Sequence, residues 1–123
     1  MEREIFEQIV ERVFHELPDI FKSSIDNVNI VVEDYPNDEI IKKMRLRSKH
    51  QLLGLYQGIP RIIRGSAYGM TAIAPDLISL YQKNIEHQCR SEKEIEEKIH
   101  EVLIHEIGHY FGMSEEEIRE AGY

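Results

Sequence analysis

Apolar residues recur at helical spacing in the first part of the chain. Between residues 2 and 17 they stand three and four positions apart, which gathers them on one face of a helix. They are Ile5, Phe6, Ile9, Val10, Val13, Phe14 and Leu17. Pro18 cannot continue a helix, because it lacks a backbone N–H and its ring clashes with the preceding turn. The pattern predicts an amphipathic helix over 2–17, followed by a turn-rich stretch.

Three short apolar runs predict β-strands over 28–32, 52–56 and 77–81. Each run has the length of a buried strand and lies close to proline, glycine or asparagine, and the first is rich in β-branched residues. Short helices are expected at 38–45 and 85–89. The segment 58–69 begins and ends with glycine. It fits either a loop, which could cover a cleft, or a pair of strands joined at Gly65.

The clearest predicted element is a long helix in the last third of the chain. Ser91 and Glu94 have the spacing of a capping box, in which two side chains satisfy the first backbone N–H groups of a helix. Apolar positions then continue at helical spacing to about Phe111. Gly112 follows as a natural C-terminal cap, because glycine readily adopts the left-handed conformation that ends many helices.

A second capping-box pair, Ser114 with Glu117, predicts a short final helix. Helical and strand patterns therefore occur together, with the helices arranged around a small sheet. A chain of 123 residues has the size of one ordinary domain. We expect a single compact α+β domain over 1–123.

Composition narrows the classes of function. Apolar residues make up 41% and charged residues 31%, as in soluble globular domains. No run approaches the roughly 20 apolar residues of a membrane span, and residues 1–17 lack the features of a signal peptide, so a cytoplasmic location without membrane contact is expected. The net charge of −8 weighs against a nucleic-acid partner. Cys89 is the only cysteine, which excludes a cysteine-based zinc site within one chain.

The sequence His105-Glu106-Ile107-Gly108-His109 carries the candidate chemistry. Histidines four residues apart on a helix lie about 40° apart around the axis and one turn apart along it, so both imidazoles can reach one point. Zinc accepts imidazole nitrogens at about 2.0–2.1 Å. Glu106 projects from the same turn and can contact a water on the metal without being a ligand. We expect His105 and His109 to bind zinc and Glu106 to act as the catalytic base.

The same helix places Glu106 within a broad apolar arc. The arc comprises Ile95, Ile99, Val102, Leu103, Ile107, Tyr110 and Phe111. A carboxylate on a core-facing stripe is costly unless it has a partner or lies in a cleft, so a metal-containing cleft is expected at that edge. Gly108 costs about 1 kcal/mol relative to alanine inside a helix. Its presence indicates the close approach of a neighbouring element or of a substrate.

A catalytic zinc ion usually has three protein ligands and one water, so a third ligand is needed. The pattern HExxHxxG is present, with Gly112 three residues after His109. In zincins with this pattern, the glycine ends the helix and turns the chain back, and the residue six after the second histidine meets the metal. That residue is Glu115, and Glu116 is the neighbouring alternative. A carboxylate is a legitimate zinc ligand at this position.

Over most of its length the sequence resembles the small bacterial zincin-like, or minimal, zinc metallopeptidase family. The resemblance rests on residues 53–60 (LGLYQGIP), 75–81 (PDLISLY) and 105–114 (HEIGHYFGMS), and on the ending AGY at 121–123. The family typically has Asp-Glu after the last serine of these segments, where this chain has Glu115-Glu116. The resemblance implies a compact zincin-like fold, a Zn2+ cofactor and peptidase activity.

Three hypotheses follow from these patterns. The first is a zinc metallopeptidase that cleaves peptides or unfolded protein, with the substrate lying along an edge strand at 77–81. The alternative is a catalytically inactive zincin-like protein with a regulatory or partner-binding role, whose metal is structural or absent. The third is a different metal-dependent hydrolase, because the related pattern HExxHxxGxxH also occurs in an RNA-processing family. Glu115 in the final position and the net charge of −8 weigh against RNA.

Overall fold

The computed structural model describes residues 1–23, 25, 27–58 and 75–122. These residues form an α+β fold, as the sequence predicts. The elements are α1 (Arg3–His15), α2 (Asp19–Lys22), β1 (Val28–Glu33), α3 (Asp38–Lys43), β2 (Gly54–Gln57), β3 (Asp76–Tyr81), α4 (Gln82–His87), α5 (Glu92–Tyr110) and α6 (Glu115–Glu120). The segment 58–69, for which a loop and a strand pair were both open, lies outside the described residues apart from Gly58.

The three strands form one mixed sheet in the order β1-β3-β2. β1 runs parallel to β3, with Val28 beside Asp76, and β2 runs antiparallel to β3, with Gly54 opposite Leu80. β3 is therefore the central strand, and the prediction that 77–81 forms a substrate-binding edge strand is wrong. A short apolar run indicates burial, but it carries no information on which strands lie beside it.

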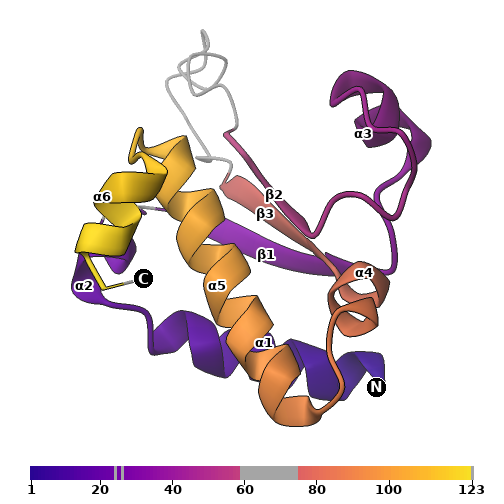
Figure 1. Cartoon of the computed structure of the whole chain (residues 1–123), viewed down its shortest axis with the longest axis horizontal. Helices are drawn as coiled ribbons and strands as arrows, with labels where there is room; N and C mark the ends of the chain where they lie inside the picture. The colour runs from indigo at the N-terminus through magenta and orange to yellow at the C-terminus, as the bar shows by residue number, and fades with distance from the viewer. Residues whose placement is uncertain (24, 26, 59–74, 123) are drawn as a thin grey trace, which may run out of the picture.

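The core lies between the sheet and helices α1 and α5, which pack against each other (Figure 1). Apolar side chains on the inner faces of these elements are almost fully buried: Phe6, Ile9, Val10 and Val13 on α1, Ile78 and Leu80 on β3, and Ile99, Leu103, Ile104 and Ile107 on α5. The helical spacing that predicted α1 and α5 is therefore the spacing of core contacts. No helix in the described ranges is long and apolar enough to cross a membrane.

Some local features differ from the sequence predictions, and the helix expected at 85–89 begins earlier, as α4 (Gln82–His87). The stretch after Pro18, predicted as turns, contains the four-residue helix α2, whose Phe21 is 1% exposed in the core. Tyr110 and Phe111, predicted on the buried arc of α5, are 46% and 44% exposed. Tyr110 and Phe111 stand at the C-terminal end of α5, where packing against other elements decides burial and the helical repeat does not.

Candidate metal centre

The end of α5 is a tight reversal centred on Gly112, whose φ is +86°. The N–H of Gly112 donates to the carbonyl of His109 at 3.0 Å, and the N–H of Met113 donates to the carbonyl of Gly108 at 2.8 Å. These two bonds form a Schellman motif, the common left-handed helix ending. The predicted glycine cap is confirmed, and it turns the chain back directly after the second histidine.

Replacing Gly112 with alanine is expected to lower the free energy of unfolding by about 1 kcal/mol, because an L side chain is strained in the left-handed region. A Cβ at this position would meet no atom within 4 Å, so no steric clash contributes. Urea denaturation measures the loss. Gly112→Asn is the control and should lose less, since asparagine tolerates this conformation. Equal stability of wild type and Gly112→Ala would refute the requirement.

Helix α6 is held against α5 by a cap and by one buried side chain. Ser114 Oγ accepts from the N–H of Glu117 at 3.1 Å, and Glu117 Oε1 accepts from the N–H of Ser114 at 3.2 Å, so the predicted capping box is confirmed. Ile118 is fully buried and lies against Gly108, where an added Cβ would stand 2.9 Å from Ile118 Cδ1. The element that approaches Gly108 is therefore α6.

Ile118→Ala is expected to lower the free energy of unfolding by about 2–5 kcal/mol, the usual cost of truncating a buried isoleucine. The same change removes the apolar contact that holds α6 on α5. Thermal and urea denaturation provide the measurement. Ile5→Ala on α1 is the matched control, because Ile5 is 42% exposed, and it should cost much less. Similar losses in the two variants would show that α6 is not anchored through Ile118.

Both histidine rings point their Nε2 atoms at the side chain of Glu115, the first residue of α6. His109 Nε2 lies 2.8 Å from Glu115 Oε1, and His105 Nε2 lies 3.2 Å from Glu115 Oε2. The hydrogen bond with His109 is the largest influence on Glu115 and lowers the pKa of that carboxyl below its ordinary value. The structure thus brings together the three side chains that the sequence predicted as ligands.

The second nitrogen of each ring is held by a backbone carbonyl. Nδ1 of His105 lies 2.9 Å from the carbonyl of Glu101, and Nδ1 of His109 lies 2.9 Å from the carbonyl of Met113. A carbonyl oxygen only accepts, so Nδ1 carries the proton in both rings and Nε2 of a neutral ring presents a lone pair. Such backbone partners are the usual way in which metal-binding histidines are oriented.

The donor set fits zinc in its chemistry. Two imidazole lone pairs and a carboxylate converge, and such an arrangement needs protons or a cation between them. Ligands of a tetrahedral zinc ion lie roughly 3.3 Å apart, given metal–ligand distances of about 2.0–2.1 Å. The distances of 2.8 and 3.2 Å from His109 and His105 to Glu115 are somewhat shorter. Within the described ranges, no group of three or more His, Cys, Asp or Glu side chains is placed so that it could hold a metal ion as it stands.

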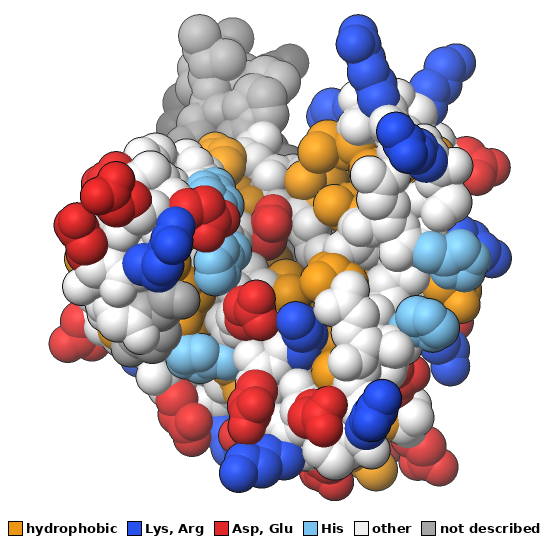
Figure 2. All heavy atoms as spheres, viewed as in Figure 1, with side chains coloured by type: hydrophobic (Ala, Val, Ile, Leu, Met, Phe, Trp, Pro, Cys, Tyr) orange, Lys and Arg blue, Asp and Glu red, His pale blue; other side chains and the backbone are white. Residues whose placement is uncertain are grey.

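Of the two candidate carboxylates, Glu115 is the one that contacts the histidines. Its neighbour Glu116 is exposed on α6. A bound ion would replace the direct contacts between His105, His109 and Glu115. Figure 2 shows histidine and acidic side chains gathered where α5 meets α6, whereas lysine and arginine side chains gather around α3.

The carboxylate of Glu106 faces strand β2. Its Oε1 accepts a hydrogen bond from the backbone N–H of Tyr56 at 3.3 Å. Burial raises the pKa of Glu106 above its ordinary value, while that hydrogen bond and the nearby His109 and His105 act in the opposite direction. The sequence predicted that this carboxylate would need a partner or a cleft. The partner is a backbone group, which no sequence pattern indicates.

A cavity of about 240 Å³ opens between β2 and α5 beside Glu106 and His105. Its remaining lining is mainly apolar and comes from Leu52, Leu53, Gly54, Glu101 and Val102. Gly54 allows the two elements to approach, because a Cβ there would stand 2.7 Å from Val102 Cγ1. A cleft beside Glu106 is therefore present, whereas the expectation that this cleft contains a metal stays a prediction.

Tyr56 connects strand β2 with α5 and β3, and sequence reasoning did not single it out. Its ring stacks on Tyr110 with a centroid distance of 3.9 Å, and its hydroxyl donates to Asp76 Oδ2 at 2.9 Å. Tyr110 is therefore a packing residue of the strand–helix contact despite its exposure. In the sequence, the signal for this role of Tyr56 is the alternation of side chains along β2, which places Tyr56 on the same face as Gly54.

The long helix of this α+β fold presents two histidines to a carboxylate that lies beyond a glycine turn. A glutamate on the same helix faces strand β2. These features define a domain of the zincin-like class. The comparisons agree. The model of the zincin-like metallopeptidase family matches residues 25–123, so the chain belongs to that family. A conserved hypothetical protein from Thermus thermophilus has a similar structure, with a TM-score of 0.54 and 25% sequence identity over 89% of this chain and 94% of that one. No curated protein matches.

Proposed function

We propose that this protein is a zinc-dependent hydrolase that cleaves peptide bonds in peptides or unfolded protein segments. The observation that carries the proposal is the convergence of His105, His109 and Glu115 beside a partly buried Glu106. In this proposal the first three side chains hold Zn2+ and Glu106 is the general base. A zinc ion bound there would polarise a carbonyl group and lower the pKa of a water molecule.

The residues of the chain have distinct tasks in this proposal. The backbone carbonyls of Glu101 and Met113 keep the two imidazoles oriented with Nε2 toward the site. A carboxylate of Glu106 accepts the proton of the attacking water and later returns it to the leaving amine. A pKa raised by burial suits this task, because a general base works best when its pKa approaches the operating pH.

The substrate, in this proposal, lies along β2, which replaces 77–81 as the candidate edge. β2 has β3 as its one neighbour among the described strands, and its Tyr56 contacts Glu106 directly. An extended peptide can add to such an edge through main-chain hydrogen bonds. Its side chains could enter the cavity beside Glu106, whose apolar lining favours apolar residues near the cleaved bond.

Metal removal tests the proposal. Protein purified without chelators is expected to contain one zinc ion per chain by elemental analysis, and to cleave some members of a diverse mixture of peptides and unfolded proteins. Cleavage, followed by mass spectrometry, should disappear after treatment with a chelator and return with added zinc. Stoichiometric zinc without cleavage of any substrate would rule out the peptidase function while leaving the metal site intact.

One observation favours a second function, a zincin-like protein without catalysis that regulates or binds a partner. Glu115 contacts both histidines directly, and among the described residues no group of three donors is placed so that it could hold a metal ion as it stands. A protein that keeps its histidines paired with this carboxylate would need no metal to maintain its fold. Protein that purifies without zinc, melts unchanged when zinc is added and cleaves no peptide would support this second function.

A further inference from the structure

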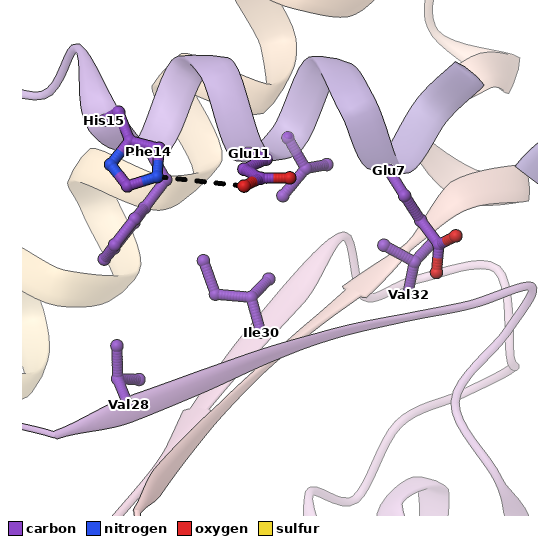
Figure 3. Close-up of a pocket in the computed structure, with 8 residues that line it drawn as sticks. Glu7, Glu11, Phe14, His15, Val28, Ile30 and Val32 are labelled. Carbon is purple, nitrogen blue, oxygen red and sulfur yellow. Dashed lines mark ion pairs between the residues drawn. The ribbon is translucent and has the colours of Figure 1, made fainter. Parts of the chain in front are cut away.

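The other edge of the sheet carries a groove that is separate from the candidate metal centre. The groove has a volume of about 330 Å³ and lies between α1 and β1. Its apolar lining comprises Val10 and Phe14 on α1 and Val28, Ile30 and Val32 on β1. Glu7, Glu11 and His15 complete the lining from α1. Figure 3 shows α1 running along the groove in the direction opposite to β1.

The hydrogen bonding of β1 shows which of its backbone groups face outward. The N–H of Asp76 on β3 donates to the carbonyl of Asn27 at 2.9 Å, so Asn27 faces β3. Successive residues of a strand present their backbone groups to opposite sides. Val28, Ile30 and Val32 therefore direct their N–H and C=O groups away from β3. Among the described strands, none lies on that side.

One end of this edge is closed. The guanidinium of Arg3 donates to the carbonyl of Val32 at 2.8 Å and is itself paired with Asp34. Side-chain cover of this kind is one way in which proteins block the pairing of an exposed strand. The open stretch is therefore the part of β1 at Val28 and Ile30, where the side chains are partly buried and pack on the core.

The two carboxylates along the groove favour a basic occupant, which would compete with His15 for Glu11, whose Oε1 lies 3.9 Å from His15 Nε2 (Figure 3). Glu7 and Glu11 are one helical turn apart, a rise of about 6 Å along α1. Alternate residues of an extended strand, which share one face, are about 6.6–6.8 Å apart. Because the two spacings nearly match, side chains at alternate positions of an added strand can each meet one carboxylate. Lysine or arginine can do so while its aliphatic stem covers Val28, Ile30 and Phe14.

From this geometry we propose that β1 binds an extended segment of a partner protein with lysine or arginine at alternate positions. The segment adds a strand to the edge of β1 that no described strand occupies, so its backbone pairs with Val28 and Ile30 and its basic side chains pair with Glu7 and Glu11. A second copy of this chain is the wrong partner, because each copy carries a net charge of −8 and would bring its own carboxylates to the groove.

A blocked peptide of alternating lysine and threonine is the probe, and the Glu106→Gln protein is used throughout so that hydrolysis cannot consume it. We expect saturable binding by fluorescence anisotropy, with the largest amide shifts in NMR spectra at Val28 and Ile30. A peptide with glutamate in place of lysine should not bind. N-methylation of alternate backbone nitrogens in the lysine peptide should abolish binding, since it removes the strand-pairing hydrogen bonds while the charge is unchanged.

The second part of the experiment reverses the charge of the two carboxylates along the groove. Glu7→Lys with Glu11→Lys should weaken binding of the lysine peptide by about tenfold or more, given two exposed ion pairs that become repulsive. The same variant should gain binding of the glutamate peptide. The matched control, Glu92→Lys with Glu97→Lys on α5, changes the net charge equally and should bind the lysine peptide within about twofold of the unreversed protein.

The proposal is overturned if the lysine peptide does not bind, if the amide shifts lie elsewhere, or if both double variants lose affinity equally. Dimerisation through β1 without added peptide would also overturn it in favour of a second copy. None of these measurements depends on zinc or on cleavage, so their outcome does not bear on the metallopeptidase proposal.

Discussion

Glu106→Gln is expected to lower kcat/KM for peptide hydrolysis by about 10²–10⁴, the usual contribution of a general base. Glutamine has nearly the same shape and can still accept the N–H of Tyr56, but it cannot accept a proton from water. Zinc should remain bound, because Glu106 is not among the side chains that converge on Glu115. Progress curves with any peptide that the wild type cleaves measure kcat/KM, and elemental analysis measures the bound zinc.

The thermal stability of the Glu106→Gln variant tests the environment of Glu106 independently of activity. Because burial raises the pKa of Glu106, the folded state disfavours its charged form, and the carboxylate costs stability at neutral pH. Removing that charge should therefore leave the melting temperature unchanged or slightly raised. Glu101→Gln is the matched control, since its exposed side chain lines the same cavity. It should retain most of the activity, and an equal loss in both variants would contradict the assignment of Glu106.

His109→Ala is expected to abolish stoichiometric zinc binding. The change removes one donor and also the contact that places Glu115, so the loss of affinity should exceed the 10–100-fold typical for an outer partner of a metal ligand. Titration against a chromophoric chelator measures this affinity. His87→Ala, an exposed histidine on α4, is the control and should bind zinc like the wild type. Undiminished binding by His109→Ala would place the metal elsewhere.

Much of the candidate site could be predicted because it is local in the sequence. The spacing of His105 and His109, the glycine at 112 and the serine that caps α6 each constrain only a few neighbouring residues. Their combined effect is the reversal that brings Glu115 to the histidines. Local patterns of this kind are reliable because helix geometry and capping depend on residues within one or two turns.

Features set by contacts between distant segments could not be predicted in this way. The order of the strands depends on which apolar runs pair, and the pattern of 77–81 would be the same in a central strand or an edge strand. The N–H of Tyr56 reaches Glu106 across 50 residues of sequence. Helix α2 has four residues, too few for a repeat to show, and the burial of Phe21 supports it.

The glycine turn also bears on how metal binding is linked to folding. The proposed donors at 105, 109 and 115 are separated by loops of a few residues, so bringing them together costs little chain entropy even in the unfolded polypeptide. If these residues hold zinc as proposed, an unfolded chain would keep part of the affinity, and binding to the unfolded state would offset the stabilisation that the metal gives the native one. Zinc bound here would raise the melting temperature only modestly, and the protein would depend on its apolar core to stay folded when the metal leaves.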